Sequence, residues 1–274
     1  MKTTLLPSLN WDIKIQPLRT MTGITTPRKV LMRNDNDHML GFLSRRYVPL
    51  SNSRFMKLCR LIEKTGNFRI EGYSTFRKGK VVMGFLRNHD HGLNINGFGL
   101  NEYLVLGNTH DGSRSIFVGS SQSLVRCENQ FTSTNPIFEK KHLGEIPIDR
   151  RFAETLKNEY DSEREGIYQI MEALRDKPVN DDIIRKLVKY LVRTDRSISA
   201  HEFNSDFKLV HPADLLRKSI SKEVAELGSN AFGLFNGVTW YTSHELPRNI
   251  NNFGNVHGMA NTINQKALQF CVEL

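Results

Sequence analysis

Hydrophobic and polar residues alternate along the first half of the chain in paired short runs that are joined by turn residues. The clearest pair is Tyr103–Leu106 and Ser115–Val118, which flank the polar segment Asn108–Ser113. The Asp-Gly step in this segment supplies the positive φ angles of a tight turn, and the β-branched and aromatic residues beside it suit a half-buried strand. The pattern predicts a β-hairpin whose tip is this segment.

Two more hairpins are predicted upstream from the same alternation. Their paired runs are Arg28–Arg33 with Met39–Ser44, and Phe68–Phe76 with Val81–Leu86. The intervening residues 34–37 and 77–80 are rich in Asn, Asp, Gly and Lys, as turns usually are. Together the three hairpins predict an antiparallel β-meander.

Two shorter elements complete the N-terminal half. The alternating run Trp11–Ile15 lies between two prolines and is typical of an edge strand. Asn52 or Ser53 can cap a helix that runs past Ile62 and ends before Gly66.

After Pro147 the period of the apolar residues changes from two to between three and four, which indicates amphipathic helices. The predicted helices are Phe152–Leu174, a helix capped by Asn180 that reaches Leu191, Asp214–Leu227, and Met259–Phe270. Strands followed by helices predict an α+β fold, with an N-terminal antiparallel β-meander and C-terminal helices packed on one face. We expect a basic β-rich region over 1–131 and a mainly helical region over 132–274, packed as one domain.

The composition is that of an ordinary globular protein. Hydrophobic residues make up 39% and charged residues 24% of the 274 positions, and no apolar run approaches the length of a membrane span. The N-terminus lacks the apolar core of a signal peptide, so we expect a cytoplasmic protein. Three widely spaced cysteines favour reduced thiols over a disulfide framework.

Positive charge is concentrated at the N-terminal end. Residues 1–100 hold 17 Lys and Arg against 6 Asp and Glu, whereas the rest of the chain is close to neutral. Cations that alternate with aromatic rings are typical of proteins that bind single-stranded nucleic acid, because cations contact phosphates and rings stack on bases. The candidates are Arg45, Arg46, Tyr47, Arg69, Phe76, Arg77, Lys78, Lys80, Arg87 and Arg114, with Tyr47 and Phe76 as the stacking rings.

Sequence motifs give little support for catalysis. There is no phosphate loop, dinucleotide fingerprint, nucleophile elbow or zinc-protease helix, so we expect no cofactor and no resident metal. The nearest approach to a metal site is His89-Asp90-His91 together with His110-Asp111. The simpler interpretation is that these are loop residues, and that Asp111 bonds its own backbone in the turn.

Several motifs resemble one known family. They are Leu40–Leu50, Leu104–Ser113, Leu124–Asn129 and Phe235–Trp240, and they occur in the order expected for the phage- and plasmid-borne family called domain of unknown function 932. The chain has Thr109 and Glu128 where many members have other residues. The resemblance singles out the turn residues Asn108, His110, Asp111, Gly112 and Ser113 and implies a mobile-element protein in a bacterial host, without an established reaction.

The order of strands and helices is also similar to that of phage single-strand annealing proteins, although no motif is shared. We therefore expect a phage- or mobile-element-encoded protein that binds nucleic acid, most simply single-stranded DNA, as an annealing or recombination accessory factor. It could form a homo-oligomer or bind a host or phage protein. Two alternatives remain open: a metal-dependent enzyme acting on nucleic acid or nucleotides at the Asn108–Ser113 turn, and an inhibitor that binds a host defence protein.

Overall fold

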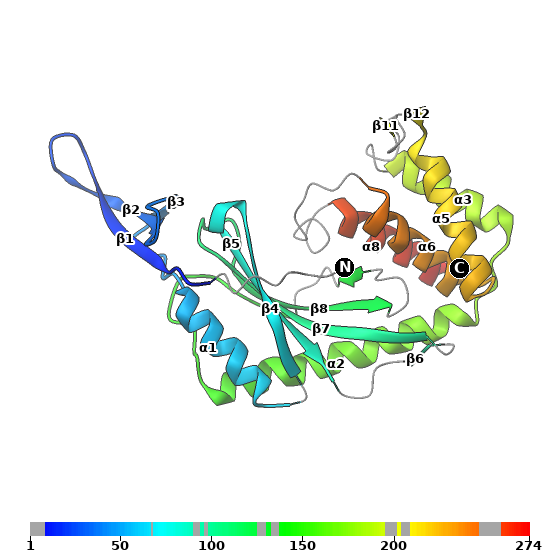
Figure 1. The fold of residues 1–274 in the computed structure, drawn as a ribbon, viewed down its shortest axis with the longest axis horizontal. Coiled ribbons are helices and arrows are strands. Elements are labelled where there is room, and N and C mark those ends of the chain that lie inside the picture. The colour runs from blue at the N-terminus through cyan, green and yellow to red at the C-terminus, as the bar shows by residue number, and fades with distance from the viewer. Residues whose placement is uncertain are drawn as a thin grey trace. The chain divides into compact units, whose positions relative to one another are not determined.

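The computed structural model describes residues 9–66, 68–89, 94–95, 98–124, 130–132, 137–194, 202–203, 209–246 and 259–274. The fold is mixed α+β, as predicted (Figure 1). The strands are β1 (Ile13–Arg19), β2 (Thr25–Arg33), β3 (Met39–Ser44), β4 (Phe68–Phe76), β5 (Val81–Asn88), β6 (Asn94–Ile95), β7 (Phe98–Thr109), β8 (Ile116–Leu124), β9 (Gln130–Thr132), β10 (Phe138–Lys140), β11 (Glu202–Phe203) and β12 (Leu209–Val210). The helices are α1 (Asn52–Glu63), the short 3-10 helix η1 (Arg77–Gly79), α2 (Arg150–Arg175), α3 (Asp181–Thr194), α5 (Pro212–Leu227), α6 (Ala231–His244) and α8 (Met259–Glu273).

The chain divides into two compact units that interleave in sequence. Unit 1 comprises Met1–Gly92, Glu102–Ser121 and Asn135–Glu163, and unit 2 comprises Leu93–Asn101, Gln122–Thr134 and Arg164–Leu274. The expected boundary at residue 131 does not coincide with this division, because two segments that begin before it belong to unit 2 and the segment that includes the first half of α2 belongs to unit 1. That the two units pack as one domain stays a prediction.

The larger sheet is the predicted meander. Its strands follow the order β10-β8-β7-β5-β4, with β6 paired to β7 and β9 paired to β8. The pairing of β4 with β5 and of β5 with β7 is antiparallel, so Val82 lies opposite Asn108 and Gly84 opposite Leu106. Opposite residues project to the same face of a sheet, and this register therefore sets which side chains face the core.

One face of this sheet is covered within unit 1 by α1 and by the first half of α2. Phe55 of α1 meets the ring of Tyr73 edge to face at 6.4 Å, and Tyr160 of α2 meets Phe68 at 5.2 Å. A Cβ on Gly84 would lie 3.0 Å from the Sγ of Cys59. A larger residue at position 84 would require the Cys59 side chain to move, so glycine here allows α1 to pack closely on β5.

The first three strands form a separate three-stranded antiparallel sheet, which we call the arm. The hairpin over residues 28–44 is confirmed, but it pairs with β1 rather than extending the meander. Leu31 lies opposite Ile15 and Gly41, whereas Val30 lies opposite Gln16 and Phe42. The arm consequently has two distinct faces, one carrying Leu31 and the other carrying Phe42.

Unit 2 has its own core, made mainly by α3, α5, α6, α8 and the second half of α2. The backbone N–H of Ile183 donates to Asn180 Oδ1 at 3.0 Å, which confirms the predicted cap of α3. Helix α6 carries buried residues on every side, including Phe232, Phe235 and Tyr241. Among the described residues, no helix is long and apolar enough to cross a membrane.

Candidate nucleic-acid interface

The family turn lies between β7 and β8, as the hairpin pattern predicted. Gly112 has a φ of +73°, which glycine adopts without strain. The Oδ1 of Asp111 accepts a hydrogen bond from the backbone N–H of Ser113 at 2.9 Å. Asn108 is not part of the turn, because β7 continues to Thr109. Asp111 and Gly112 therefore have roles that the turn itself explains.

His110 is fully buried beside this turn. The Nδ2 of Asn52 donates to the carbonyl of Trp11 at 3.0 Å, so its Oδ1 is the acceptor that faces His110 Nε2 at 2.9 Å. The hydrogen of the neutral imidazole is consequently on Nε2. Burial, together with the nearby His142, lowers the pKa of His110 to about 4. His110 is therefore a neutral, hydrogen-bonded core residue at pH 7.

The neighbours of His110 come from three distant segments. Asn108 Nδ2 donates to the carbonyl of Leu50 at 3.0 Å, and the hydroxyl of Tyr47 donates to the carbonyl of Thr109 at 2.6 Å. The ring of Tyr47 stacks on His142 at 4.7 Å. These contacts attach the end of β7 to the segment between β3 and α1, which explains why polar residues here are buried.

Two side chains of the family motif are inaccessible to a substrate in this structure. Asn108 and His110 have no exposed surface, so a substrate cannot reach their side chains in this structure. No group of three His, Cys, Asp or Glu residues that could hold a metal ion occurs in the described part of the chain. His89 is exposed, whereas Asp90 and His91 lie outside the described residues. The histidines of the two proposed parts of a metal site that can be compared therefore differ in exposure, since His89 is exposed and His110 is buried.

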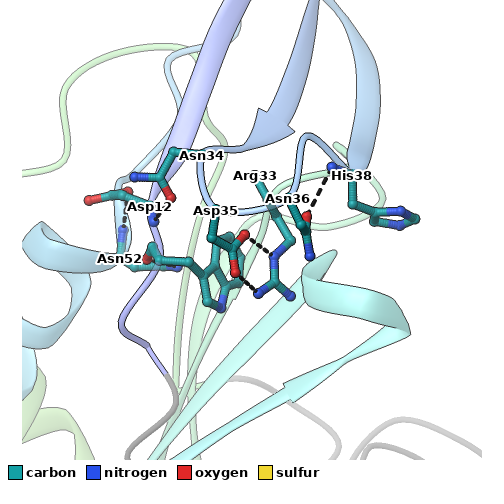
Figure 2. A network of polar contacts seen from close by, with 8 residues as sticks. Asp12, Arg33, Asn34, Asp35, Asn36, His38 and Asn52 are labelled. Atoms are coloured by element: carbon teal, nitrogen blue, oxygen red, sulfur yellow. Dashed lines mark hydrogen bonds and ion pairs between the residues drawn. The ribbon is translucent and has the colours of Figure 1, made fainter.

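A polar network anchors the arm at the start of α1 (Figure 2). The carboxylate of Asp12 accepts the backbone N–H of Asn52 at 3.0 Å and the hydroxyl of Ser53 at 2.9 Å. The guanidinium of Arg33 forms a two-point ion pair with Asp35 and lies over the ring of Trp11, 4.3 Å from its centroid. The N-cap of α1 is Ser51, one residue before the predicted caps. Because these contacts join β1, β2 and α1, they fix the base of the arm.

Six of the eight candidate cations lie near this anchored end of the larger sheet. The turns that carry them are adjacent, because the backbone N–H of His110 donates to the carbonyl of Lys80 at 2.8 Å and Gly112 approaches Leu43 at the end of β3. These six are Arg45, Arg46, Arg77, Lys78, Lys80 and Arg114. Arg69 and Arg87 lie opposite each other at the far end of β5, so the structure does not bring them into this group.

Exposure distinguishes among the six. Arg45, Arg46 and Lys78 are exposed, and their side chains form no hydrogen bond or ion pair within the described structure. Arg77 and Arg114 are also exposed, whereas Lys80 is half-buried. Arg87 forms an ion pair with Glu71 at 3.4 Å. The free positive charge is thus greatest at Arg45, Arg46 and Lys78.

The prediction that Tyr47 and Phe76 stack on bases does not agree with their burial. Tyr47 is 8% exposed and Phe76 is 6% exposed, so neither ring offers a face to a base in this structure. The aromatic ring that is exposed beside the cations is Phe42 of the arm, at 50%. Sequence reasoning missed Phe42 because a phenylalanine in an alternating strand usually faces the core.

The described residues define an α+β protein in which a basic β-sheet arm contacts the family turn at the end of an antiparallel sheet. Residues 39–266 match the family described as Domain of unknown function (DUF932), so the chain belongs to this family. This confirms the relationship that the sequence motifs indicated. No curated protein and no solved structure matches the chain.

Proposed function

We propose that this protein binds single-stranded nucleic acid through unit 1, as an annealing or recombination accessory factor of a phage or other mobile element in the bacterial cytoplasm. The observation that carries the proposal is the set of exposed cations without side-chain partners next to an exposed ring. Cations that are not neutralised by the protein remain available for phosphates, and each phosphate contact releases counterions.

The net charges of the two units also support nucleic-acid binding by unit 1. Unit 1 contains 23 Lys and Arg and 15 Asp and Glu, a net charge of +8, which leaves 15 and 14, or +1, for unit 2. A polyanion is therefore attracted to unit 1 before any specific contact forms.

Reversal of Arg45 and Arg46 to Glu tests the proposal. Binding of a fluorescent single-stranded oligonucleotide should weaken by roughly tenfold or more at low salt. If each arginine neutralises one phosphate, the slope of log affinity against log salt should flatten by about 1.4. Both side chains are exposed, so thermal unfolding should be nearly unchanged.

The matched control is reversal of Lys186 and Lys189, which are exposed on α3 in unit 2 and change the net charge equally. This variant should bind almost as the unaltered protein does. Equal losses from both reversals would indicate a diffuse effect of net charge, and absence of binding by the unaltered protein at low salt would eliminate the proposal.

A further inference from the structure

The arm presents one face that its own packing does not use. Leu31 is fully buried and Leu43 is 8% exposed, and both belong to the face whose Gly41 lies against the backbone of Asp111. We call this the docked face. The other face, which we call the open face, carries Phe42 and Val30 opposite each other.

Phe42 is half exposed on this open face, and its cross-strand neighbours do not cover it. Val30 lies between Phe42 and the exposed Gln16, and Met32, two residues further along β2, is half-buried. Since the docked face already supplies the buried contacts, the ring of Phe42 contributes little to holding the arm in place. An exposed aromatic ring on a firmly anchored sheet suits contact with a partner.

Three cations lie close to Phe42 in the register of the arm. Arg28 is two residues from Val30 on the same strand, so it lies about 7 Å along the open face. It is exposed and its side chain has no partner among the described residues. Arg45 and Arg46 follow directly after Ser44, the residue opposite Arg28. Three exposed cations thus lie within four residues of Phe42 along the chain or beside it on β2.

We infer that the open face of the arm binds unpaired bases, with Phe42 stacking on a base and Arg28 contacting the adjoining phosphate. This inference rests on the proposed function and adds the residue that distinguishes single strands from duplexes. A flat ring on a sheet can stack only on bases whose faces are exposed, as they are in single strands and not within a duplex. The charge of the face favours a polyanion over an apolar partner.

The test compares Phe42→Ala with Phe42→Trp. Loss of a stacking ring should weaken binding of a single-stranded oligonucleotide by about 5- to 150-fold, and tryptophan should restore it. An abasic strand of the same length has phosphates but no bases, so Phe42→Ala should bind it as well as the unaltered protein does. Ile170→Ala, which removes a partly exposed apolar side chain from α2 in unit 2, is the control and should have no effect.

Three results would overturn the inference. The first is unchanged single-strand binding by Phe42→Ala. If the double variant Arg45→Glu, Arg46→Glu still weakened binding in that case, the proposed function would stand and only the role of Phe42 would be excluded. An equal loss on the abasic strand would mean that the ring does not stack on bases. A change in oligomeric state on size-exclusion chromatography of Phe42→Ala, without a specific loss of single-strand binding, would assign the face to a second copy of the chain.

Discussion

A buried imidazole couples the stability of unit 1 to pH. His110 has a pKa of about 4 in the folded protein, because burial penalises the imidazolium and His142 adds to the penalty, against about 6.5 for an exposed histidine. Between these values the unfolded chain binds more protons than the folded chain. The stabilisation by neutral His110 is therefore complete above about pH 6.5 and is lost as the pH falls toward 4.

We predict that the free energy of unfolding, measured with urea from pH 7.5 to 4.5, will fall by on the order of 3 kcal/mol through His110 alone. His110→Gln should be less stable at pH 7.5 but should show a shallower decline. Burial also lowers the pKa of His142, so some decline should remain. A pH profile identical to that of the unaltered protein would contradict this role for His110.

Two glycines with similar φ angles allow the effect of backbone strain on stability to be separated from the effect of side-chain crowding. Gly112 has φ +73° and Gly23 has φ +84°, but a Cβ at Gly112 would lie 2.6 Å from Leu43 Cδ2, whereas one at Gly23 would meet nothing within 4 Å. We predict that Gly23→Ala lowers the free energy of unfolding by about 1 kcal/mol through strain alone. Gly112→Ala should cost at least ~1 kcal/mol more because of crowding.

Chemical denaturation of both variants measures this difference. In a Leu43→Ala background the crowding is removed, so Gly112→Ala should then cost no more than Gly23→Ala. If the extra cost persisted in that background, the contact with Leu43 would not be its cause.

Among single residues, the exposure of the cations could be predicted from the sequence, but the exposure of the aromatic rings could not. Charged side chains are rarely buried, so the exposure of Arg45, Arg46 and Lys78 could be expected. An aromatic ring can serve either a core or a surface, and alternation along a strand does not say which face is covered. Tyr47 and Phe76 turned inward, while Phe42 remained exposed.

At the scale of elements, the start of α1 depends on a residue forty positions away. Helix α1 has no acidic residue in its first turn, and the carboxylate of Asp12 provides the negative charge there. Ser51 also caps the helix, by accepting the backbone N–H of Arg54 at 3.2 Å. Asp12 thus contributes both to the start of α1, beside the N-cap Ser51, and to the anchor of the arm.

We predict that Asp12→Asn lowers the free energy of unfolding by about 1 kcal/mol, because the amide has no charge to oppose the helix dipole and one acceptor oxygen fewer. Asp37→Asn is the control, since Asp37 forms an exposed ion pair with Lys14 at 3.4 Å and should change stability by less than ~0.5 kcal/mol. Urea denaturation followed by tryptophan fluorescence measures both. Equal effects would show that the cap contributes no more than a surface ion pair.

Most elements were predictable because their periodicity is local. The three hairpins and the helices over residues 152–174, 180–191, 214–227 and 259–270 all occur, with small shifts at their ends. Helix α6 could not be predicted in this way, because its sequence shows no amphipathic periodicity. Its residues are buried on all sides, so no polar face repeats at the helical period.

At the scale of the whole molecule, the charge excess of the first hundred residues becomes a property of unit 1. Residues 1–92 fall entirely within it and carry a net charge of +11, which its later segments lower to +8. The proposed interface therefore combines a global attraction with local contacts at the arm.

The sequence by itself determined the α+β class, the family, the hairpins and the basic character of the N-terminal region, because each depends on neighbouring residues or on composition. Only the tertiary structure decided that Asn108 and His110 of the family motif are buried, that the first three strands form a separate arm, and that Phe42 is the exposed ring. These features depend on contacts between segments far apart in the chain, such as Asp12 with Ser53 and Tyr47 with Thr109. Local patterns carry no information on which distant segment will cover a given face.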